Sequence, residues 1–394
     1  MKKVLIFSLA YYPKFTSGAE AAVKEITHRI SPEDIEFHML TVRFDMKDPV
    51  YEKVDNVHVH RVGFGNHYIS KVLFVPLSAL QGIMLHKKHT FDALWALMTY
   101  MLFPVALMRL LGTRVPHVLT LQDGDPYEKV FERWFIRPLT PLLDYGFRTA
   151  SKIQVISRYL GTWPERRGYT GDIELIYNGA NPKNLNPEYT QEEAEAVRDT
   201  LGKKEGDVYM LNAARLVHQK GHDTVIRALP LLPDHVHFLL IGSGPDEAML
   251  KKLADELNVT ERVHFLGQKD RDDVPLYRNP TVIDIFIGPS RSEGLGNSFL
   301  SAMAARVPVV TTQEGGLAEF VFDARRDSEK ETTAWAVDKE NPEQIAEAVN
   351  DILANPEKVE AVTTRARALV LEKYNWDMIG KQMHERVFKP VFNS

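Results

Sequence analysis

The feature that most constrains how this sequence can fold is its series of short apolar runs of strand length, separated by amphipathic stretches. A first series consists of VLIFS from Val4, IEFHMLTV from Ile35, VHVHRV from Val57, ALWALM from Ala93, HVLTLQ from His117, KIQVIS from Lys152 and IELIYNG from Ile173. A second series consists of VYMLNAAR from Val208, VHFLLIGSG from Val236, VHFLG from Val263, IDIFIGPS from Ile283, VPVVTT from Val307 and a weak WAV at Trp335. Apolar strands that alternate with helices form parallel sheets covered on both faces. The sequence therefore predicts two doubly wound α/β domains.

The length of the chain agrees with two domains. At 394 residues it exceeds the size at which a single core normally keeps growing. The acidic, helix-prone segment QEEAEAVRDTLGKKEGD lies between the two series, so we place the junction near residues 180 to 205. After Asn375 the chain reads WDMIGKQMHERVFKPVF, an amphipathic helix that could cap either domain.

Composition excludes several classes of protein. The formal net charge of −5 gives no global attraction to nucleic acid or to an anionic membrane. The chain has no cysteine, which excludes disulfides, thiolate metal sites and cysteine nucleophiles, and a reducing cytoplasm suits it. We interpret the N-terminal apolar run as a buried first strand rather than a signal peptide. Residues 93 to 108 are too short for a membrane span and contain Pro104, so a strand followed by a core helix is expected there.

Loops that follow strands are the informative places, because ligands of open parallel sheets bind outside the carboxyl ends of the strands. After the first strand, AYYPKFTSGAE brings Gly18 to the start of a helix, where backbone N–H groups could bind an anion or the glycine could serve only a tight turn. The dinucleotide fingerprint G-x-G-x-x-G is absent there, which argues against a dehydrogenase. After the strand at Val208, Arg215 and Lys220 flank a turn closed by Gly221. Two such cations could neutralise a diphosphate, or they could be ordinary solvated surface charges.

A second candidate loop is SRSEGLGNSFLSAMAARVPVV, which follows the strand at Ile283. Gly294 and Gly296 allow backbone N–H groups to approach a ligand, and a helix begins directly afterwards. Glu293 would repel a phosphate, so neutral hydroxyls such as those of a sugar are its better partners. Glu293 could instead cap the helix, although Asn297 lies closer to the expected N-cap. The loop favours a ligand that carries both phosphate and hydroxyl groups.

These residues resemble the retaining glycosyltransferases of family 4, which have the GT-B fold. The most specific part is PSRSEGLGNSFLSAMAARVPVVTTQEGG, supported by AARLVHQKG, IGSGP, NGAN at Asn178 and the early loop YYPKFTSGAE. The resemblance implies two Rossmann-like domains that face a central cleft, with a C-terminal helix that crosses back to the N-terminal domain. The expected bounds are residues 1–185 for an acceptor-binding domain, 200–374 for a donor-binding domain and 375–394 for the helix.

The resemblance also implies roles for individual residues. Arg215 and Lys220 would bind the donor diphosphate, Gly18 would offer its N–H to the distal phosphate, and Glu293 would hold hydroxyls of the transferred sugar. The other expected donor-binding residues are Gly294, Leu295, Gly296, Asn297 and Ser301. Transfer with retention is pictured in this family as front-face attack, in which the leaving diphosphate accepts the proton of the acceptor, so neither a metal nor another cofactor is expected. The protein then acts by electrostatic stabilisation and by positioning.

Three positions depart from the family pattern. Ser301 stands where the family has a second glutamate that binds the ribose, and a neutral hydroxyl loses charge-assisted hydrogen bonds worth on the order of 1.5 to 3 kcal/mol each. On the acceptor side many relatives carry a histidine where this chain has Gln122; with Asp123 and Asp125 it could bind acceptor hydroxyls, or the aspartates could cap the next helix. Arg306 stands where a glycine is common, which costs on the order of 1 kcal/mol if the backbone is left-handed there.

The sequence thus predicts a retaining glycosyltransferase of the hexosyltransferase type, which moves a sugar from a nucleotide-diphosphate donor to a glycan, lipid-linked or small-molecule acceptor. The alternatives are a non-catalytic relative used for binding or assembly, motivated by Ser301 and Gln122, and an isomerase acting on a nucleotide sugar. No nucleic-acid partner is expected. The segment from Ile69 to His89 has an apolar face and a basic end, so it is either a core-packing helix or a peripheral contact with the inner face of the membrane. Otherwise we expect a cytoplasmic protein.

Overall fold

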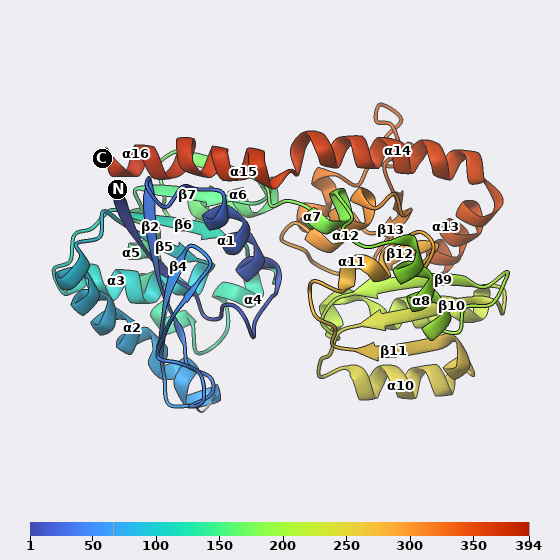
Figure 1. The fold of residues 1–394 in the computed structure, drawn as a ribbon, viewed down its shortest axis with the longest axis horizontal. Helices are drawn as coiled ribbons and strands as arrows, with labels where there is room; N and C mark the ends of the chain where they lie inside the picture. The colour runs from blue at the N-terminus through green and yellow to red at the C-terminus, as the bar shows by residue number, and fades with distance from the viewer. Residues whose placement is uncertain (66, 394) are drawn as a thin grey trace. The chain divides into compact units, whose positions relative to one another are not determined.

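The architecture is described from a computed structural model of residues 1–65 and 67–393, with the side chains of residues 67 and 68 left aside. The chain divides into two compact units (Figure 1). The first unit comprises Met1–Asn178 together with Trp376–Ser394, and the second comprises Gly179–Asn375. Each unit is built on its own sheet. We describe each unit by itself.

The first unit contains an eight-stranded sheet in the order β3-β4-β2-β1-β5-β6-β7-β8. Its strands are β1 Lys2–Phe7, β2 Ile35–Val42, β3 Tyr51–Val54, β4 Val57–Val62, β5 Ala93–Leu97, β6 His117–Leu121, β7 Lys152–Val155 and β8 Ile173–Leu175. All neighbours are parallel except β3, which forms an antiparallel hairpin with β4. The central strand β1 pairs on one side with β2 and on the other with β5.

Helices cover both faces of this sheet. They are α1 Gly18–His28, α2 His67–His89, η1 Thr99–Met101, α3 Leu102–Leu110, α4 Tyr127–Phe131, η2 Arg137–Leu139, α5 Thr140–Arg148 and α6 Arg158–Arg166. The C-terminal run adds α15 Trp376–Gln382, the π-helical turn η7 Met383–Phe388 and α16 Lys389–Phe392. Trp376, Phe388 and Val391 of this run share one buried cluster with Val4 of β1 and Val23 of α1. The C-terminal helix therefore completes the core of the N-terminal unit (Figure 1).

The second unit contains a six-stranded, all-parallel sheet in the order β11-β10-β9-β12-β13-β14. Its strands are β9 Val208–Ala213, β10 Val236–Ile241, β11 Val263–Gly267, β12 Ile285–Gly288, β13 Val309–Thr311 and β14 Trp335–Ala336. Its longer helices are α8 Gln191–Thr200, α10 Glu247–Glu256, α12 Asn297–Ala304, α13 Pro342–Ala354 and α14 Pro356–Lys373. The shorter ones are α7 Pro182–Leu185, η3 His218–Lys220, α9 His222–Ala228, η4 Leu229–Leu231, η5 Thr260–Arg262, α11 Val274–Tyr277 and η6 Gly315–Glu319.

The predicted strands are confirmed in both series, including the weak one at Trp335. Most are apolar runs buried on both faces, whereas β4 alternates between buried and half-buried residues and β8 is half-buried throughout. The stretch from Ala93 is a strand followed by a helix, as predicted. The sequence analysis missed β3, whose residues YEKV alternate between exposed and half-buried and contain two charges. It is an edge strand that pairs only with β4, so it carries no continuous apolar signal.

Helix α2 packs against the sheet with Phe74, Ala79 and Leu85 buried. Within the described part of the chain it also contains the one segment, Ile69–His89, that is long and apolar enough to cross a membrane by length and composition. Only 33% of that segment's best apolar window is buried. The helix therefore has a packed face and an apolar face that the first unit leaves open.

Candidate functional site

The second unit places two loops side by side at the point where the strand order reverses. β9 pairs with β10 on one side and with β12 on the other, and the chain then continues from β12 to β13 and β14. The loop after β9 carries Arg215 and Lys220, and the loop after β12 carries Glu293. A reversal of strand order is where open α/β sheets bind ligands. The fold thus places all three residues predicted to be central after neighbouring strands, and it brings Lys220 and Glu293 into direct contact.

The loop after β9 is held close to β12 by a glycine that no other residue could replace. Gly221 has φ +69°, and a Cβ there would lie 2.2 Å from the carbonyl oxygen of Pro289. His222 follows, and its Nε2 lies 3.1 Å from the Arg215 carbonyl oxygen. Burial lowers the pKa of His222 to about 4, so its neutral ring donates Nε2–H to that carbonyl at pH 7. The Arg215 backbone is fixed in this way while its side chain stays exposed.

Arg291 ties the two loops together. Its guanidinium donates two hydrogen bonds of 2.9 Å to the carboxylate of Asp223 and one to the His218 carbonyl. Its backbone N–H donates to the Gln219 carbonyl at 2.7 Å. Burial alone would raise the pKa of Asp223, but the Arg291 hydrogen bonds keep it below its usual value. A bidentate pair of this kind fixes geometry as well as charge, so the loops form one rigid edge.

Glu293 is buried, with 7% of its surface exposed, and it contacts the other loop directly. Its Oε1 accepts hydrogen bonds from Lys220 Nζ at 2.6 Å and from Ser290 Oγ at 2.9 Å. Within the described part of the chain, Oε2 accepts none. The Glu293 carbonyl oxygen accepts the N–H of Gly316 at 2.9 Å. One carboxylate oxygen is therefore held by the protein while the other remains for a ligand.

The turn after Glu293 is compressed against the segment that follows β13. A Cβ on Gly316 would lie 2.0 Å from the Gly294 carbonyl oxygen. Leu295 is buried at 1% exposure and anchors the turn in the core. Gly296, with φ +98°, is the N-cap of α12, and Asn297 is its first residue. Asn297 is therefore adjacent to the N-cap and closer to it than Glu293, as expected, and the chain enters the helix through a left-handed glycine.

Ser301 lies inside the unit. It is buried at 3% exposure, its Oγ accepts the Asn181 N–H at 3.0 Å, and it donates to the Asn297 carbonyl at 2.8 Å. The hydroxyl predicted to contact the donor is thus hydrogen-bonded to the linker that enters the second unit.

The predicted acceptor-side residues follow β6 of the first unit. Gln122 Oε1 accepts a hydrogen bond from Asn178 Nδ2 at 2.8 Å, while the Gln122 Nε2 atom is buried and unpartnered among the described residues. Asp123 Oδ2 accepts from the N–H and hydroxyl of Thr99 at 3.2 and 3.1 Å. Burial raises the pKa of Asp123 to about 6, although the Thr99 hydrogen bonds oppose the rise. Asp125 lies further out, paired with Lys129 at 2.8 Å and Arg133 at 3.2 Å.

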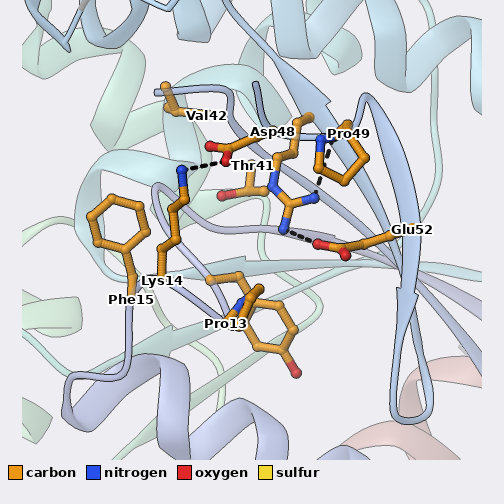
Figure 2. A pocket seen from close by; sticks show the side chains of 10 residues that line it. Pro13, Lys14, Phe15, Thr41, Val42, Asp48, Pro49 and Glu52 are labelled. Carbon is orange, nitrogen blue, oxygen red and sulfur yellow. Dashed lines mark hydrogen bonds and ion pairs between the residues drawn. The ribbon is translucent and has the colours of Figure 1, made fainter. Parts of the chain in front are cut away.

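A pocket with a mixed polar and apolar lining opens on the same edge of the first unit's sheet (Figure 2). It lies between the loop after β1, the end of β2 and the start of the β3–β4 hairpin. Lys14 Nζ pairs with Asp48 at 2.5 Å, and Arg61 pairs with Glu52 while donating to the Tyr12 carbonyl at 3.0 Å. These lining residues are Tyr11, Pro13, Lys14, Phe15, Thr41, Val42, Asp48, Pro49, Glu52 and Arg61. Gly18 begins α1 at the end of the loop that forms one wall.

Several of these residues were not found from the sequence. Ser290 and Arg291 stand within the quoted loop, but only the fold shows that they contact Glu293 and the loop after β9. Thr99 follows β5 at a strained position, since the preceding residue Met98 has φ +67°. The pocket residue Asp48 lies in the loop before β3, and Arg61 lies in β4, whose run was recognised as a strand without a role for this side chain. Thr99 could have been selected from the sequence, because it follows a predicted strand closely.

Two family models match the chain in succession. Residues 16–184 match the model described as Glycosyltransferase Family 4, and residues 193–369 match the model described as Glycosyl transferases group 1. Together with two parallel-sheet α/β domains, these matches identify the protein as a glycosyltransferase of the GT-B, family 4-like class, which confirms the predicted fold and enzyme class.

Individual relatives agree with this class. An uncharacterized glycosyltransferase of Methanocaldococcus jannaschii is 27% identical, with 96% of each chain covered. The GDP-mannose-dependent alpha-(1-6)-phosphatidylinositol monomannoside mannosyltransferase of Mycobacterium tuberculosis is 28% identical over 55% of this chain and 56% of its own. Among solved structures, HepE of Anabaena, crystallised with UDP and glucose, superposes with a TM-score of 0.80 at 19% identity and covers 98% of this chain and 100% of its own.

Proposed function

We propose that the protein transfers a sugar, with retention of anomeric configuration, from a nucleoside-diphosphate donor to a glycan, lipid-linked or small-molecule acceptor. The observation that carries this proposal is the arrangement of Arg215, Lys220 and Glu293 at the strand reversal of the second unit. Among the described residues Arg215 has no ion-pair partner and is exposed, so its guanidinium is available to a diphosphate. The relatives that use GDP-mannose or bind UDP support a donor of this class.

The chemical roles follow from the contacts. Arg215 and Lys220 stabilise the negative charge that develops on the leaving diphosphate, and such preorganised charges act most strongly away from water. Glu293 Oε2 accepts hydrogen bonds from hydroxyls of the transferred sugar and orients its anomeric carbon. In front-face transfer the leaving phosphate oxygen takes the acceptor's proton as the acceptor oxygen attacks, so no side chain is needed as base.

The first unit supplies the acceptor side in this proposal. The Gly18 N–H, at the start of α1, offers a hydrogen-bond donor to a phosphate group. The buried Gln122 amide, whose Nε2 has no partner among the described residues, donates to an acceptor hydroxyl when Gln122 turns toward the ligand. Thr41, whose hydroxyl has no partner among the described residues, lines the pocket of Figure 2. An acceptor rich in hydroxyls satisfies these polar groups.

Calorimetric titration with UDP, GDP, dTDP and ADP tests the donor site. We expect micromolar binding of one nucleotide and a loss of roughly 10- to 100-fold in affinity for Lys220→Ala, because a hydrogen bond to a charged group contributes about 1.5 to 3 kcal/mol. Arg215→Ala should lose affinity for the nucleotide to a similar extent. Lys252→Ala is the matched control, since its side chain is 79% exposed on α10 and pairs with Glu256. Equal affinity in all four proteins would refute the assignment.

Glu293→Gln separates phosphate binding from sugar binding. The variant should bind the free nucleotide at least as tightly as the wild type, because Lys220 loses its competing carboxylate. Its affinity for the matching nucleotide sugar should fall about tenfold or more relative to the nucleotide. Proton NMR of the product anomer, formed by transfer or slow hydrolysis, tests retention. An inverted product would contradict the front-face mechanism.

We further propose that the protein is cytoplasmic and contacts the inner face of a membrane through α2. Ile69, Val72, Leu80 and Met84 are 48%, 58%, 53% and 57% exposed, and their spacing places them on one helix face. Lys87 continues that face at the basic end of the helix. Such a face lies in the interfacial plane of an anionic bilayer. A lipid-linked acceptor would then be presented at the bilayer surface.

Vesicle sedimentation tests this contact. The wild type should pellet with phosphatidylglycerol vesicles more than with phosphatidylcholine vesicles, and Leu80→Glu should reduce the bound fraction severalfold. Leu231→Glu is the control, since Leu231 is equally exposed at 51% but belongs to the second unit. No difference between the two variants would exclude α2 as the contact.

A further inference from the structure

Histidines gather on one face of the first unit's sheet, away from the edge that carries the acceptor-side residues. Glu36 and His38 lie near the start of β2, His58 and His60 lie on the adjacent strand β4, and His89 ends α2. Residues two apart on a strand share a face, so Glu36 and His38 point to the same side. The carboxyl ends of these strands, where ligands of the transfer reaction bind, lie at the opposite edge. Nothing in the proposed transfer uses this cluster.

The donor atoms of three of these residues converge. Glu36, His38 and His89 each offer one ligand atom, and these atoms lie within 4.8 Å of one another. His38 Nε2 is 2.9 Å from Glu36 Oε1, and the rings of His38 and His89 are 4.6 Å apart between centroids. Ligands about 2.0 to 2.2 Å from a tetrahedral zinc ion lie roughly 3.3 Å from each other. The three atoms lie within 4.8 Å, so rotations of the half-buried Glu36 and His89 side chains would be needed to bring them to that spacing.

We propose that Glu36, His38 and His89 form a binding site for a divalent transition-metal ion of the zinc type. Two imidazoles and one carboxylate suit Zn²⁺, and a water molecule or a neighbouring imidazole completes the four ligands.

The surroundings of His38 support this assignment. With its Nε2 on the ion, its Nδ1–H is directed at His60 Nε2, 3.0 Å away. A histidine ligand normally donates its second ring N–H to such an acceptor, which fixes the tautomer and the ring orientation. His38 is 3% exposed, and its ring also stacks on His58 with centroids 4.8 Å apart. The central ligand is therefore held in place before any ion binds.

A lysine ammonium contacts one of the proposed ligands. Lys3 Nζ lies 3.1 Å from Glu36 Oε1 and opposes a dication. Its side chain is 28% exposed, so the ammonium can turn to solvent when the ion enters.

A bound ion would join the end of α2 to β2. Because α2 carries the apolar face described above, the ion would fix the helix on the sheet, and binding to the folded state alone stabilises that state by mass action. The role is structural, at the edge opposite the transfer site.

The test uses the full chain after treatment with a chelator and dialysis. Titration with ZnCl₂ should show one saturable site and a rise in melting temperature of several degrees. His89→Gln, which removes the least buried histidine ligand, should bind at least tenfold more weakly with an unchanged melting temperature in the metal-free state. His60→Phe, which removes the acceptor for His38 Nδ1–H, should weaken binding by about tenfold or more. Co²⁺ in place of Zn²⁺ should give the intense visible absorption of a tetrahedral site in the wild type and lose it in His89→Gln.

Two controls address binding at other histidines. His28→Gln removes an exposed histidine of the same unit that pairs with Asp55, and His264→Gln removes half of the His237–His264 pair in the second unit. Both should bind zinc as the wild type does. The proposal is overturned if the wild type shows no saturable stoichiometric binding, or if His89→Gln binds zinc as tightly as the wild type.

Discussion

Replacing Arg306 by glycine should stabilise the second unit, because the backbone there is left-handed. Arg306 has φ +60° and follows the last residues of α12. Its N–H donates to the Met303 carbonyl at 3.1 Å, and the N–H of Val307 donates to the Ala302 carbonyl at 3.0 Å. This pair of bonds defines a Schellman motif, in which the residue at the Arg306 position is usually glycine. The backbone at Arg306 is thus left-handed, and under that condition a residue other than glycine lowers the stability of the fold.

The size of the effect follows from three contributions. A left-handed conformation costs a residue with a Cβ about 1 to 2 kcal/mol. Replacement by glycine removes this cost but also makes the unfolded chain more flexible, which reduces the gain in stability by about 0.4 to 1 kcal/mol. The Arg306–Glu360 contact is 3.7 Å long between side chains 53% and 72% exposed, so its loss is worth little. We expect a net gain in unfolding free energy of about 1 kcal/mol.

Urea unfolding monitored by tryptophan fluorescence measures this gain, and the shift of the midpoint at constant slope is the quantity to compare. Arg306→Ala removes the ion pair but keeps a Cβ, so it should stay within about 0.5 kcal/mol of the wild type. Glu360→Ala should do the same. A gain in Arg306→Ala equal to that in Arg306→Gly, or no gain in Arg306→Gly, would refute the argument from backbone strain.

Three further variants test the site. The pKa of Asp123 in the folded protein, about 6, lies above its unfolded value, so the wild type loses stability as the pH rises from about 4 to 6. The unfolding free energy of Asp123→Asn, measured relative to wild type by urea titration, should therefore increase by up to about 3 kcal/mol between pH 4 and pH 7. A difference that stays constant with pH would contradict this expectation. Gly316→Ala would press a Cβ onto the Gly294 carbonyl, so we expect a loss of roughly 1 to 3 kcal/mol in urea and at least tenfold weaker nucleotide binding by calorimetry, whereas wild-type affinity would show that the turn does not shape the site. Arg291→Gln should weaken nucleotide binding without contacting the ligand, and a double-mutant cycle with Asp223→Asn should give a coupling energy above about 1 kcal/mol; additive effects would show that the pair does not brace the loops.

The fold could be predicted because its strands are buried on both faces. Each apolar run in the two series became a strand. For the central strands this is because a parallel sheet covered by helices leaves no polar face to interrupt the run. β3 was missed because Tyr51 and Lys53 are exposed, and the strand exists only through its pairing with β4 across the turn at Asp55. A pairing of this kind is a tertiary property that single-strand periodicity does not contain.

The site was predictable to the extent that it follows strand ends. Arg215, Lys220 and Glu293 could be selected because each lies just after a strand, and the strand order then brings them together. The bracing by Arg291 could not, because its partner Asp223 lies 68 positions away in the chain. The histidine cluster was not predicted from the sequence for the same reason, since Glu36 and His89 meet only when α2 packs on β2. Contacts between distant segments depend on packing that composition and spacing do not specify.

The contacts of Glu293 also resolve a difficulty that the sequence raised. A carboxylate next to a phosphate-binding turn should repel the donor, yet here Lys220 lies 2.6 Å from Oε1 and Ser290 donates to the same oxygen. The charge of Glu293 is thereby balanced within the protein, and in the proposed function Oε2 is left for sugar hydroxyls. Lys220 has three donor hydrogens and can bond Glu293 and a phosphate oxygen together. The same pair would then hold the sugar from one side and the leaving group from the other, so that a variant at either residue should alter both the affinity for the nucleotide sugar and its rate of cleavage.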